Sequence, residues 1–277
     1  QPQQGAGPRA RMNPEPPVPS PPDLNPGLVE LIDLVAERQR ADFGHMASDL
    51  KSDGSLITAC DRWSDATLVE GLARLFPGEG VLSEEGNKAV PKTSAYWVVD
   101  PLDGTTNFAA GIPYWAISIA RFEAGRPVLA VLDVPPLRQR IVAIRGQGAW
   151  RNGRPLLAPS GQSHPAGCAS LCSRSIGVLQ KLPNQRFPGK IRLLGVASLN
   201  LVSVAMGQTI SALEATPKIW DLAAAWLVLS ELECPIRWLV RSPESIDAGS
   251  DLSAADFPVL AADRPETLAR FMPWADA

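Results

Sequence analysis

Near the start of the chain, apolar residues recur every three or four positions, at Leu28, Leu31, Ile32, Val35 and Ala36. This spacing is typical of an amphipathic helix, and it predicts a helix over residues 27–48. Asn25 and Pro26 precede the stripe and are suited to its cap and its first-turn proline.

A second amphipathic stretch predicts a helix over residues 61–76, which the pair Pro77-Gly78 ends. Between the two helices, residues 50–58 predict a turn at Asp53-Gly54 followed by a short strand. The first part of the chain therefore begins with two helices joined by a small extended segment.

Short apolar runs bounded by turn residues follow these helices, and each run predicts a strand. The predicted strands cover residues 80–83, 96–99, 116–121, 128–134 and 140–144. Gly- and Pro-rich turns separate the last three, which predicts an antiparallel meander, with residues 146–153 as a hairpin at its rim.

The second half of the chain alternates strand-like and helix-like stretches, including a strongly apolar helix over residues 220–233. Residues 193–213 contain no charged side chain, but Asn200, Gln208 and several serines make a membrane span unfavourable there. We therefore expect a buried helix and strand in this stretch. A strand-rich centre with helices on either side predicts a layered α+β fold.

The proline distribution divides the chain into a tail and two further parts. Residues 1–26 hold nine of the 27 prolines and predict a disordered tail, followed by an N-terminal part over residues 27–159 and a C-terminal part over residues 160–277.

With 26 Lys and Arg against 29 Asp and Glu, the net charge of −3 argues against nucleic-acid binding through a broad basic surface. No export or membrane segment is visible, and four scattered cysteines favour free thiols, so we expect a cytoplasmic protein.

Acidic residues follow directly after apolar runs at three places. Asp100 and Asp103 stand three positions apart after the strand at 96–99, Glu84 follows the strand at 80–83, and Asp221 begins the helix at 220–233. Carboxylates at the end of a buried strand are costly unless a cation lies between them, and Mg²⁺ prefers such oxygen ligands. Simpler interpretations also exist: an Asx-type turn for the first pair, a loop for Glu84 and a helix cap for Asp221.

The same segments resemble signature segments of the inositol monophosphatase family of Mg²⁺-dependent phosphatases. The matching segments are DPLDGTTNF at 100–108, SEEG at 83–86, WDLAAA at 220–225, KSDGSLITACD at 51–61 and the central stretches 118–137 and 143–156. The resemblance covers about residues 27 to 270. It implies a layered αβαβα sugar-phosphatase fold, a homodimer, a small phosphorylated substrate and sensitivity to lithium.

The resemblance also implies two to three Mg²⁺ ions and their ligands. Glu84, Asp100 and the Leu102 carbonyl would hold the first ion. Asp100, Asp103 and Asp221 would hold the second, so that Asp100 bridges the two. A third, weaker ion would depend on Glu84 largely through water.

The remaining implied roles concern catalysis and the substrate. The implied catalytic residues are Asp61, Glu84 and Thr105, and the pair Asp61–Thr105 would polarise the attacking water. The implied substrate-binding residues are Asp103, Gly104, Thr105, Gly195, Val196, Ala197 and Glu214. Departures from the family pattern at Ser83, at 109–110 and at 231–239 affect substrate preference and loop geometry, not the metal ligands.

The sequence therefore predicts a Mg²⁺-dependent phosphomonoesterase acting on inositol monophosphate or a similar small polyol phosphate. Because the same fold serves several reactions, a histidinol-phosphatase, a fructose-1,6-bisphosphatase and a 3′(2′),5′-bisphosphate nucleotidase stay open as alternatives. The alternative that is not an enzyme is a catalytically silent scaffold protein. The intact acids argue against a scaffold, since such a protein has no physical need for a repulsive cluster.

Overall fold

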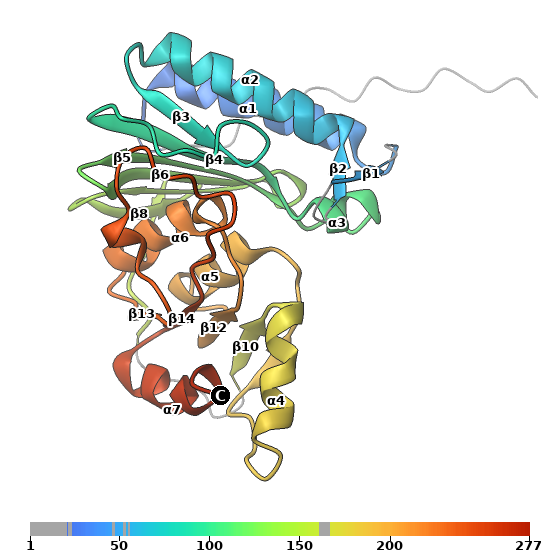
Figure 1. Ribbon diagram of the computed structural model, residues 1–277, viewed down its shortest axis with the longest axis vertical. Coiled ribbons are helices and arrows are strands. Elements are labelled where there is room, and N and C mark those ends of the chain that lie inside the picture. Colours follow the sequence, from blue (N-terminus) through green and yellow to red (C-terminus); the bar gives the residue numbers. More distant parts are fainter. Residues whose placement is uncertain (1–20, 22–23, 46–47, 52–53, 55, 161–166) are drawn as a thin grey trace, which may run out of the picture.

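The computed structural model describes residues 21, 24–45, 48–51, 54, 56–160 and 167–277. The predicted Pro-rich tail, apart from residues 21 and 24–26, and Asp53 of the predicted turn lie outside the described residues. Figure 1 shows helices and sheets stacked in layers, with the first two helices on one outer face and α4 (Val178–Lys181) and α7 (Pro265–Ala275) on the other.

The outer helical layer consists of α1 (Pro26–Asp42) and α2 (Ala59–Leu75), which cover one face of the first sheet. The Asn25 side chain caps α1 by accepting a hydrogen bond from the Gly27 N–H at 2.9 Å. The predicted helix over 27–48 is too long, because Phe43 leaves the helical region with ψ 128°. Its ring stacks on Trp115 with 4.7 Å between centroids, so tertiary packing ends this helix.

Among the described residues, seven strands form the first sheet, in the order β3-β4-β5-β6-β7-β8-β9. They are β3 (Gly80–Ser83), β4 (Ala95–Asp103), β5 (Ala116–Glu123), β6 (Arg126–Val134), β7 (Gln139–Ile144), β8 (Gly148–Arg151) and β9 (Arg154–Pro155). β3 pairs with β4 in parallel and all other pairs are antiparallel, which confirms the predicted meander.

The strand β4 differs from its prediction. The sequence predicts a strand at 96–99 closed by an acidic turn, whereas β4 continues through the acidic segment to Asp103. Its register against β5 shifts between Asp100 and Asp103, so a β-bulge replaces part of the predicted turn. Pro101 lies inside the bulge, where its missing N–H removes no regular ladder bond.

The middle layer contains α5 (Ala197–Ala205) and α6 (Ile219–Glu231), which pack between the two sheets. Almost every residue of α6 is buried, as expected for a helix that is apolar on all sides. The uncharged stretch 193–213 forms α5 and most of the strand β12 (Ser211–Glu214), which confirms a buried helix and strand there.

Five strands form the second sheet of the described chain, in the order β11-β10-β12-β14-β13. The strands are β10 (Cys168–Leu171), β11 (Lys190–Arg192), β12 (Ser211–Glu214), β13 (Ile236–Trp238) and β14 (Val259–Ala262). Its outer face carries α4 (Val178–Lys181) and α7 (Pro265–Ala275). The smaller elements are β1 (Ser48–Leu50), β2 (Leu56–Thr58), α3 (Thr105–Ala109) and 3₁₀ turns at Pro135–Leu137, Ser173–Gly177 and Pro243–Ser245.

The order of layers is therefore helix, sheet, helix, sheet, helix, and the predicted αβαβα fold is confirmed. The largest apolar cluster fills the space around α5 and α6 and contains residues from both sheets. A second cluster lies between the first sheet and the pair α1 and α2. None of the described helices is long and apolar enough to cross a bilayer.

Candidate metal centre and active site

The bulge at the end of β4 presents the first two acids of the site. Asp100 is 1% exposed and accepts a hydrogen bond from the Leu102 N–H at 3.0 Å, which holds the bulged backbone. The Pro101 carbonyl accepts a hydrogen bond from the buried Gln39 amide of α1 at 2.8 Å. Gly104 then turns the chain into α3 with φ +103°, a conformation that favours glycine.

The third acid comes from a distant part of the chain. Asp221 is the third residue of α6, and its carboxylate accepts a hydrogen bond from the Lys218 N–H at 2.7 Å. The capping interpretation of Asp221 is thus partly correct, although Lys218 occupies the cap position. The Ser118 hydroxyl of β5 donates to the Trp220 carbonyl at 3.3 Å and ties this helix start to the first sheet.

The three acids converge on one point. Asp100, Asp103 and Asp221 each offer a carboxylate oxygen, and these oxygens lie within 4.8 Å of one another. Burial raises the pKa of Asp100 and of Asp221 well above the ordinary aspartate value, and neighbouring carboxylates raise both further. Burial raises the pKa of Asp103 to about 6, although the Ser198 N–H donates to its carboxylate at 2.8 Å. Such an all-oxygen donor set fits a hard divalent cation that neutralises it.

Glu84 lies beside this group rather than within it, among the described residues. Its N–H donates to the Val99 carbonyl at 3.1 Å, and its half-buried carboxylate pairs with the Lys51 ammonium at 2.9 Å. Lys51 also binds Glu85. The Glu84 charge nevertheless raises the pKa of Asp100, because the two carboxylates repel each other electrostatically.

A hydrogen-bonded pair lies next to the acids. The Thr105 hydroxyl of α3 donates to the Asp61 carboxylate of α2 at 2.7 Å and lies 3.2 Å from the Leu102 carbonyl. Asp61 is 1% exposed, and the Thr58 N–H and hydroxyl hold its second oxygen. The structure therefore brings Asp61 and Thr105 together from elements that lie far apart in the sequence.

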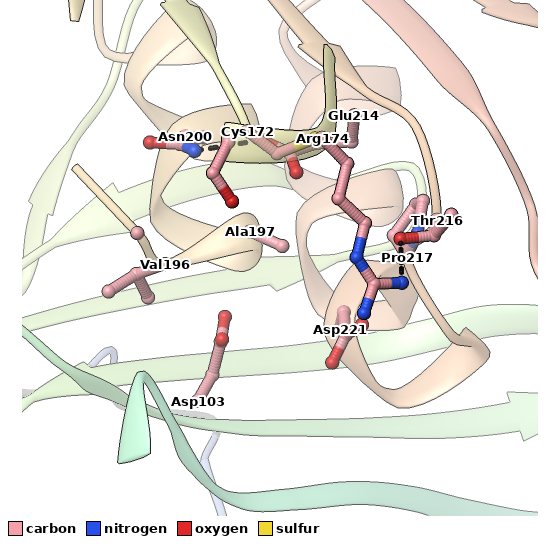
Figure 2. Close-up of a pocket in the computed structure, with 12 residues that line it drawn as sticks. Asp103, Cys172, Arg174, Val196, Ala197, Asn200, Glu214, Thr216, Pro217 and Asp221 are labelled. Atoms are coloured by element: carbon pink, nitrogen blue, oxygen red, sulfur yellow. Dashed lines mark hydrogen bonds between the residues drawn. The ribbon is translucent and has the colours of Figure 1, made fainter. Parts of the chain in front are cut away.

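Most of the predicted substrate residues line a pocket of about 200 Å³ beside the acids, and Gly104 and Thr105 lie outside its lining. Those in the lining are Asp103, Gly195, Val196, Ala197 and Glu214. Figure 2 shows Glu214, Asn200 and the segment around Val196 arranged around this pocket, with Asp103 and Asp221 at one side. Glu214 is 3% exposed, and the Asn200 amide donates to it at 2.7 Å. Burial raises the pKa of Glu214 to about 7, although the Asn200 hydrogen bond opposes the shift.

The sequence interpretation missed several residues that support the site. Gln39 is fully buried, and its side chain bonds Ser64, the Pro101 carbonyl and the Trp115 indole. Its signal was a polar residue on the apolar stripe of α1, four positions after Val35. Ser198 acts through its backbone N–H, so its residue type carried no signal.

The chain is similar to known proteins both in sequence and in fold. A histidinol-phosphatase of Mycobacterium tuberculosis is 35% identical over 213 residues, which is 73% of this chain and 82% of the relative. An inositol-1-monophosphatase of Mesorhizobium japonicum is 32% identical over 227 residues, 76% of this chain and 83% of the relative. The solved structure of a Thermotoga maritima IMPase has a TM-score of 0.75 at 24% identity, covering 89% of this chain and 96% of that one.

The fold, the buried acids and these relatives define a phosphatase that hydrolyses phosphate monoesters with a divalent metal cofactor. The model of the inositol monophosphatase family matches residues 28–241. The chain therefore belongs to the inositol monophosphatase family, as the sequence segments predicted.

Proposed function

We propose that this phosphatase hydrolyses inositol monophosphate or a similar small polyol phosphate, with Mg²⁺ as the metal. One observation carries the proposal: three carboxylates within 4.8 Å lie beside the Asp61–Thr105 pair. Four ligand carboxylates and a phosphate monoester carry about −6 together, which three Mg²⁺ ions neutralise. Without the ions, the same acids would repel the substrate.

Two to three ions fit the residues present. Glu84, Asp100 and the Leu102 carbonyl are the proposed ligands of one ion, and Asp100, Asp103 and Asp221 are those of another. When bound, the metal lowers the pKa of a water molecule and stabilises the leaving alkoxide. The Leu102 carbonyl oxygen is suited to be a metal ligand, because the Thr105 hydroxyl beside it donates its proton to Asp61 instead.

The Asp61–Thr105 pair is the proposed positioning device for the attacking water. A threonine hydroxyl has one proton, and the contact with the Asp61 carboxylate is shorter than that with the Leu102 carbonyl. The proton therefore points at Asp61, and the Thr105 oxygen is left to accept a hydrogen bond from water. Such an acceptor orients the water molecule and polarises its O–H bond.

The substrate is proposed to lie between the acids and Glu214. The backbone N–H groups of Gly104 and Thr105 suit the phosphate oxygens, because they lie where the chain enters α3. Glu214 and the segment 195–197 line the rest of the pocket and suit the hydroxyls of a polyol.

Phosphate release in the presence of Mg²⁺ tests the reaction and the substrate. The panel contains inositol 1-phosphate, histidinol phosphate, fructose 1,6-bisphosphate and adenosine 3′,5′-bisphosphate, each with a chelator control and with added Li⁺. We expect inositol 1-phosphate to be hydrolysed fastest and Li⁺ to inhibit. A preference for histidinol phosphate, the substrate class named for the Mycobacterium tuberculosis relative, would replace our substrate, and no turnover at all would favour the scaffold.

Two variants test the proposed roles. Asp100→Asn removes a ligand shared by both principal ions, so kcat should fall by about 10³-fold or more. Glu214→Gln should mainly raise KM for inositol 1-phosphate, by about tenfold. The exposed acid Asp247 gives the control, because Asp247→Asn should leave both constants unchanged. Full activity of Asp100→Asn would contradict the ligand assignment.

We also propose that the chain forms a homodimer, as the family resemblance implies. Exposed apolar side chains at Ile112, Leu193 and Leu194 support a contact surface near the site. The Asn107 side chain connects these segments, since its amide donates to the Leu194 carbonyl at 2.8 Å. Light scattering after size exclusion should give twice the mass of the chain, and the double variant Leu193→Asp, Leu194→Asp should give a single chain.

A further inference from the structure

The first turn of α5 holds side chains from both ends of the pocket. The Ser198 N–H donates to the carboxylate of Asp103, a member of the acidic cluster, at 2.8 Å. Two residues later, the Asn200 amide donates to the Glu214 carboxylate at 2.7 Å. Figure 2 shows Asn200 on this helix and Glu214 at the end of β12. One helical turn therefore sets the position of Glu214 relative to the acids.

Both partners of the Asn200–Glu214 hydrogen bond have a fixed backbone. The Asn200 N–H donates to the Val196 carbonyl at 2.9 Å, and the Asn200 carbonyl accepts from the Ser203 hydroxyl at 2.7 Å. Glu214 is the last residue of β12 and pairs with Val259 of β14. The two side chains are 1% and 3% exposed, so neither can turn into solvent.

The other end of the Asn200 amide is energetically unfavourable. Within the part of the chain that the structure describes, its Oδ1 atom is buried and has no hydrogen-bond partner. Buried polar atoms are nearly always paired, and an apolar side chain of similar size would avoid this loss. The benefit of an asparagine here is its Nδ2 donor, and the acceptor of that donor is Glu214.

The hydrogen bond determines how the Glu214 carboxylate is presented to the pocket. Asn200 binds the Oε1 atom. An ionised carboxylate accepts through both oxygens, so Oε2 is left for hydroxyl groups of a polyol in the pocket. Without the amide, the carboxylate would be free to rotate about its terminal bond, which is a soft torsion. Its free oxygen would then have no fixed position for the substrate to meet.

We propose that Asn200 is a positioning residue for recognition of the alcohol part of the substrate. It acts through Glu214, whose carboxylate it orients, and does not itself bind the substrate. The inference rests on the proposed function, because it requires Glu214 to face the substrate hydroxyls. The contact should therefore affect substrates whose alcohol part carries hydroxyls and should not affect phosphate esters without them.

The experiment compares inositol 1-phosphate with 4-nitrophenyl phosphate, whose alcohol part carries no further hydroxyl. With Mg²⁺ present, kcat/KM for inositol 1-phosphate should fall about tenfold in Asn200→Leu, mainly through KM, which is the size of one hydrogen bond to a charged group. The value for 4-nitrophenyl phosphate should not change. Asn200→Asp replaces the donor by an acceptor and should lower the inositol 1-phosphate value at least as much. Because Asp preserves the side-chain volume, this variant gives the same test if Leu is not tolerated in the fold.

A double variant tests whether Asn200 acts only through Glu214. Glu214→Ala alone should raise KM for inositol 1-phosphate, and adding Asn200→Leu should raise it no further. The matched control is Asn184→Leu, because Asn184 is exposed and lies outside the pocket lining, and it should leave both substrates unaffected. Additive effects of Asn200→Leu and Glu214→Ala on KM would overturn the positioning role.

The two substrates also separate this inference from the proposed function. An equal loss of kcat/KM for both substrates in Asn200→Leu and in Asn200→Asp would indicate a structural role only. Unchanged kinetics with inositol 1-phosphate in both variants would likewise overturn the role of Asn200, while the phosphatase reaction would stand. Hydrolysis of neither substrate by the unmodified protein would overturn both the proposed function and the role of Asn200.

Discussion

At the scale of single residues, hydrogen-bond partners decide what each polar group of the site can do. Thr105 has a charged acceptor in Asp61, and Asp61 in turn is held by Thr58. Gln39 makes three contacts from a fully buried position. These side chains have fixed orientations because their partners are buried with them.

The first prediction concerns the Thr105 hydroxyl. Thr105→Val removes the group that orients the attacking water, so kcat should fall by about 10² to 10³-fold with little change in KM. Thr105→Ser keeps the hydroxyl and should retain most of the activity. The neighbouring Thr106 is exposed, and Thr106→Val is the matched control, which should behave as the unmodified protein. An active Thr105→Val variant would remove this residue from the mechanism.

The second prediction concerns Gln39. Gln39→Leu leaves the Pro101 carbonyl and the Trp115 indole N–H without their partner inside the protein, and each unsatisfied group costs about 1–3 kcal/mol. The free energy of unfolding should therefore fall by about 2–4 kcal/mol, measured by urea denaturation. Gln180→Leu, at an exposed position of α4, is the control and should change it little. Equal stability of Gln39→Leu and the control would contradict this account.

At the scale of elements, periodicity predicted which segments form helices and strands, and packing decided where they end. The stripe from Leu28 to Ala36 defined α1, but its end depends on Phe43, which stacks on Trp115 far along the chain. The strand β4 was predicted too short because its acids interrupt the apolar pattern. A bulge of this kind depends on how the strand pairs with its neighbour, and the local sequence pattern does not indicate which strand that neighbour is.

The third prediction concerns the turn between β4 and α3. A Cβ on Gly104 would lie 2.8 Å from the Val196 side chain and 3.3 Å from the Trp115 backbone, with φ at +103°. Gly104→Ala should therefore lower the free energy of unfolding by about 1–3 kcal/mol and lower kcat, since the turn carries Thr105. Gly125→Ala is the control, because Gly125 also has a positive φ but no atom within 4 Å of the added carbon. Thermal melts of the two variants should separate steric crowding from backbone strain alone.

At the scale of the whole molecule, the site forms where three layers meet. The first sheet supplies Asp100 and Asp103, α6 supplies Asp221, and α2 supplies Asp61. The convergence of Asp100, Asp103 and Asp221 was predictable because each acid adjoins an apolar run and lies in a segment typical of one family. The role of Gln39 was not predictable, since it depends on Pro101 and Trp115 from another layer, which sequence spacing does not reveal.

The fourth prediction concerns pH and metal. Burial raises the pKa of Asp103 to about 6 and of Glu214 to about 7, above the unfolded values of about 4. The folded metal-free protein therefore binds these protons more tightly, so their stabilising effect is present at low pH and is lost as pH rises through about 6 to 7. Bound Mg²⁺ would take the place of the proton on Asp103 and should restore stability at the higher pH.

Thermal melts with chelator or with Mg²⁺, at about pH 5 and about pH 8, measure this linkage. The rise in Tm on adding Mg²⁺ should be larger at the higher pH. Asp103→Asn combined with Glu214→Gln removes two of the groups with raised pKa values, and it should weaken the dependence of Tm on pH in chelator. A larger metal effect at the lower pH would contradict the competition between protons and Mg²⁺ for the carboxylates of the acidic cluster.

The position of Asp221 late in the chain has a consequence for synthesis on the ribosome. While the polypeptide is still growing, the two acids of β4 emerge long before α6 exists, and on their own they lack the third carboxylate. On the proposed ligand assignment, tight binding of the metal ion therefore begins only after α6 has been made and has packed against the first sheet.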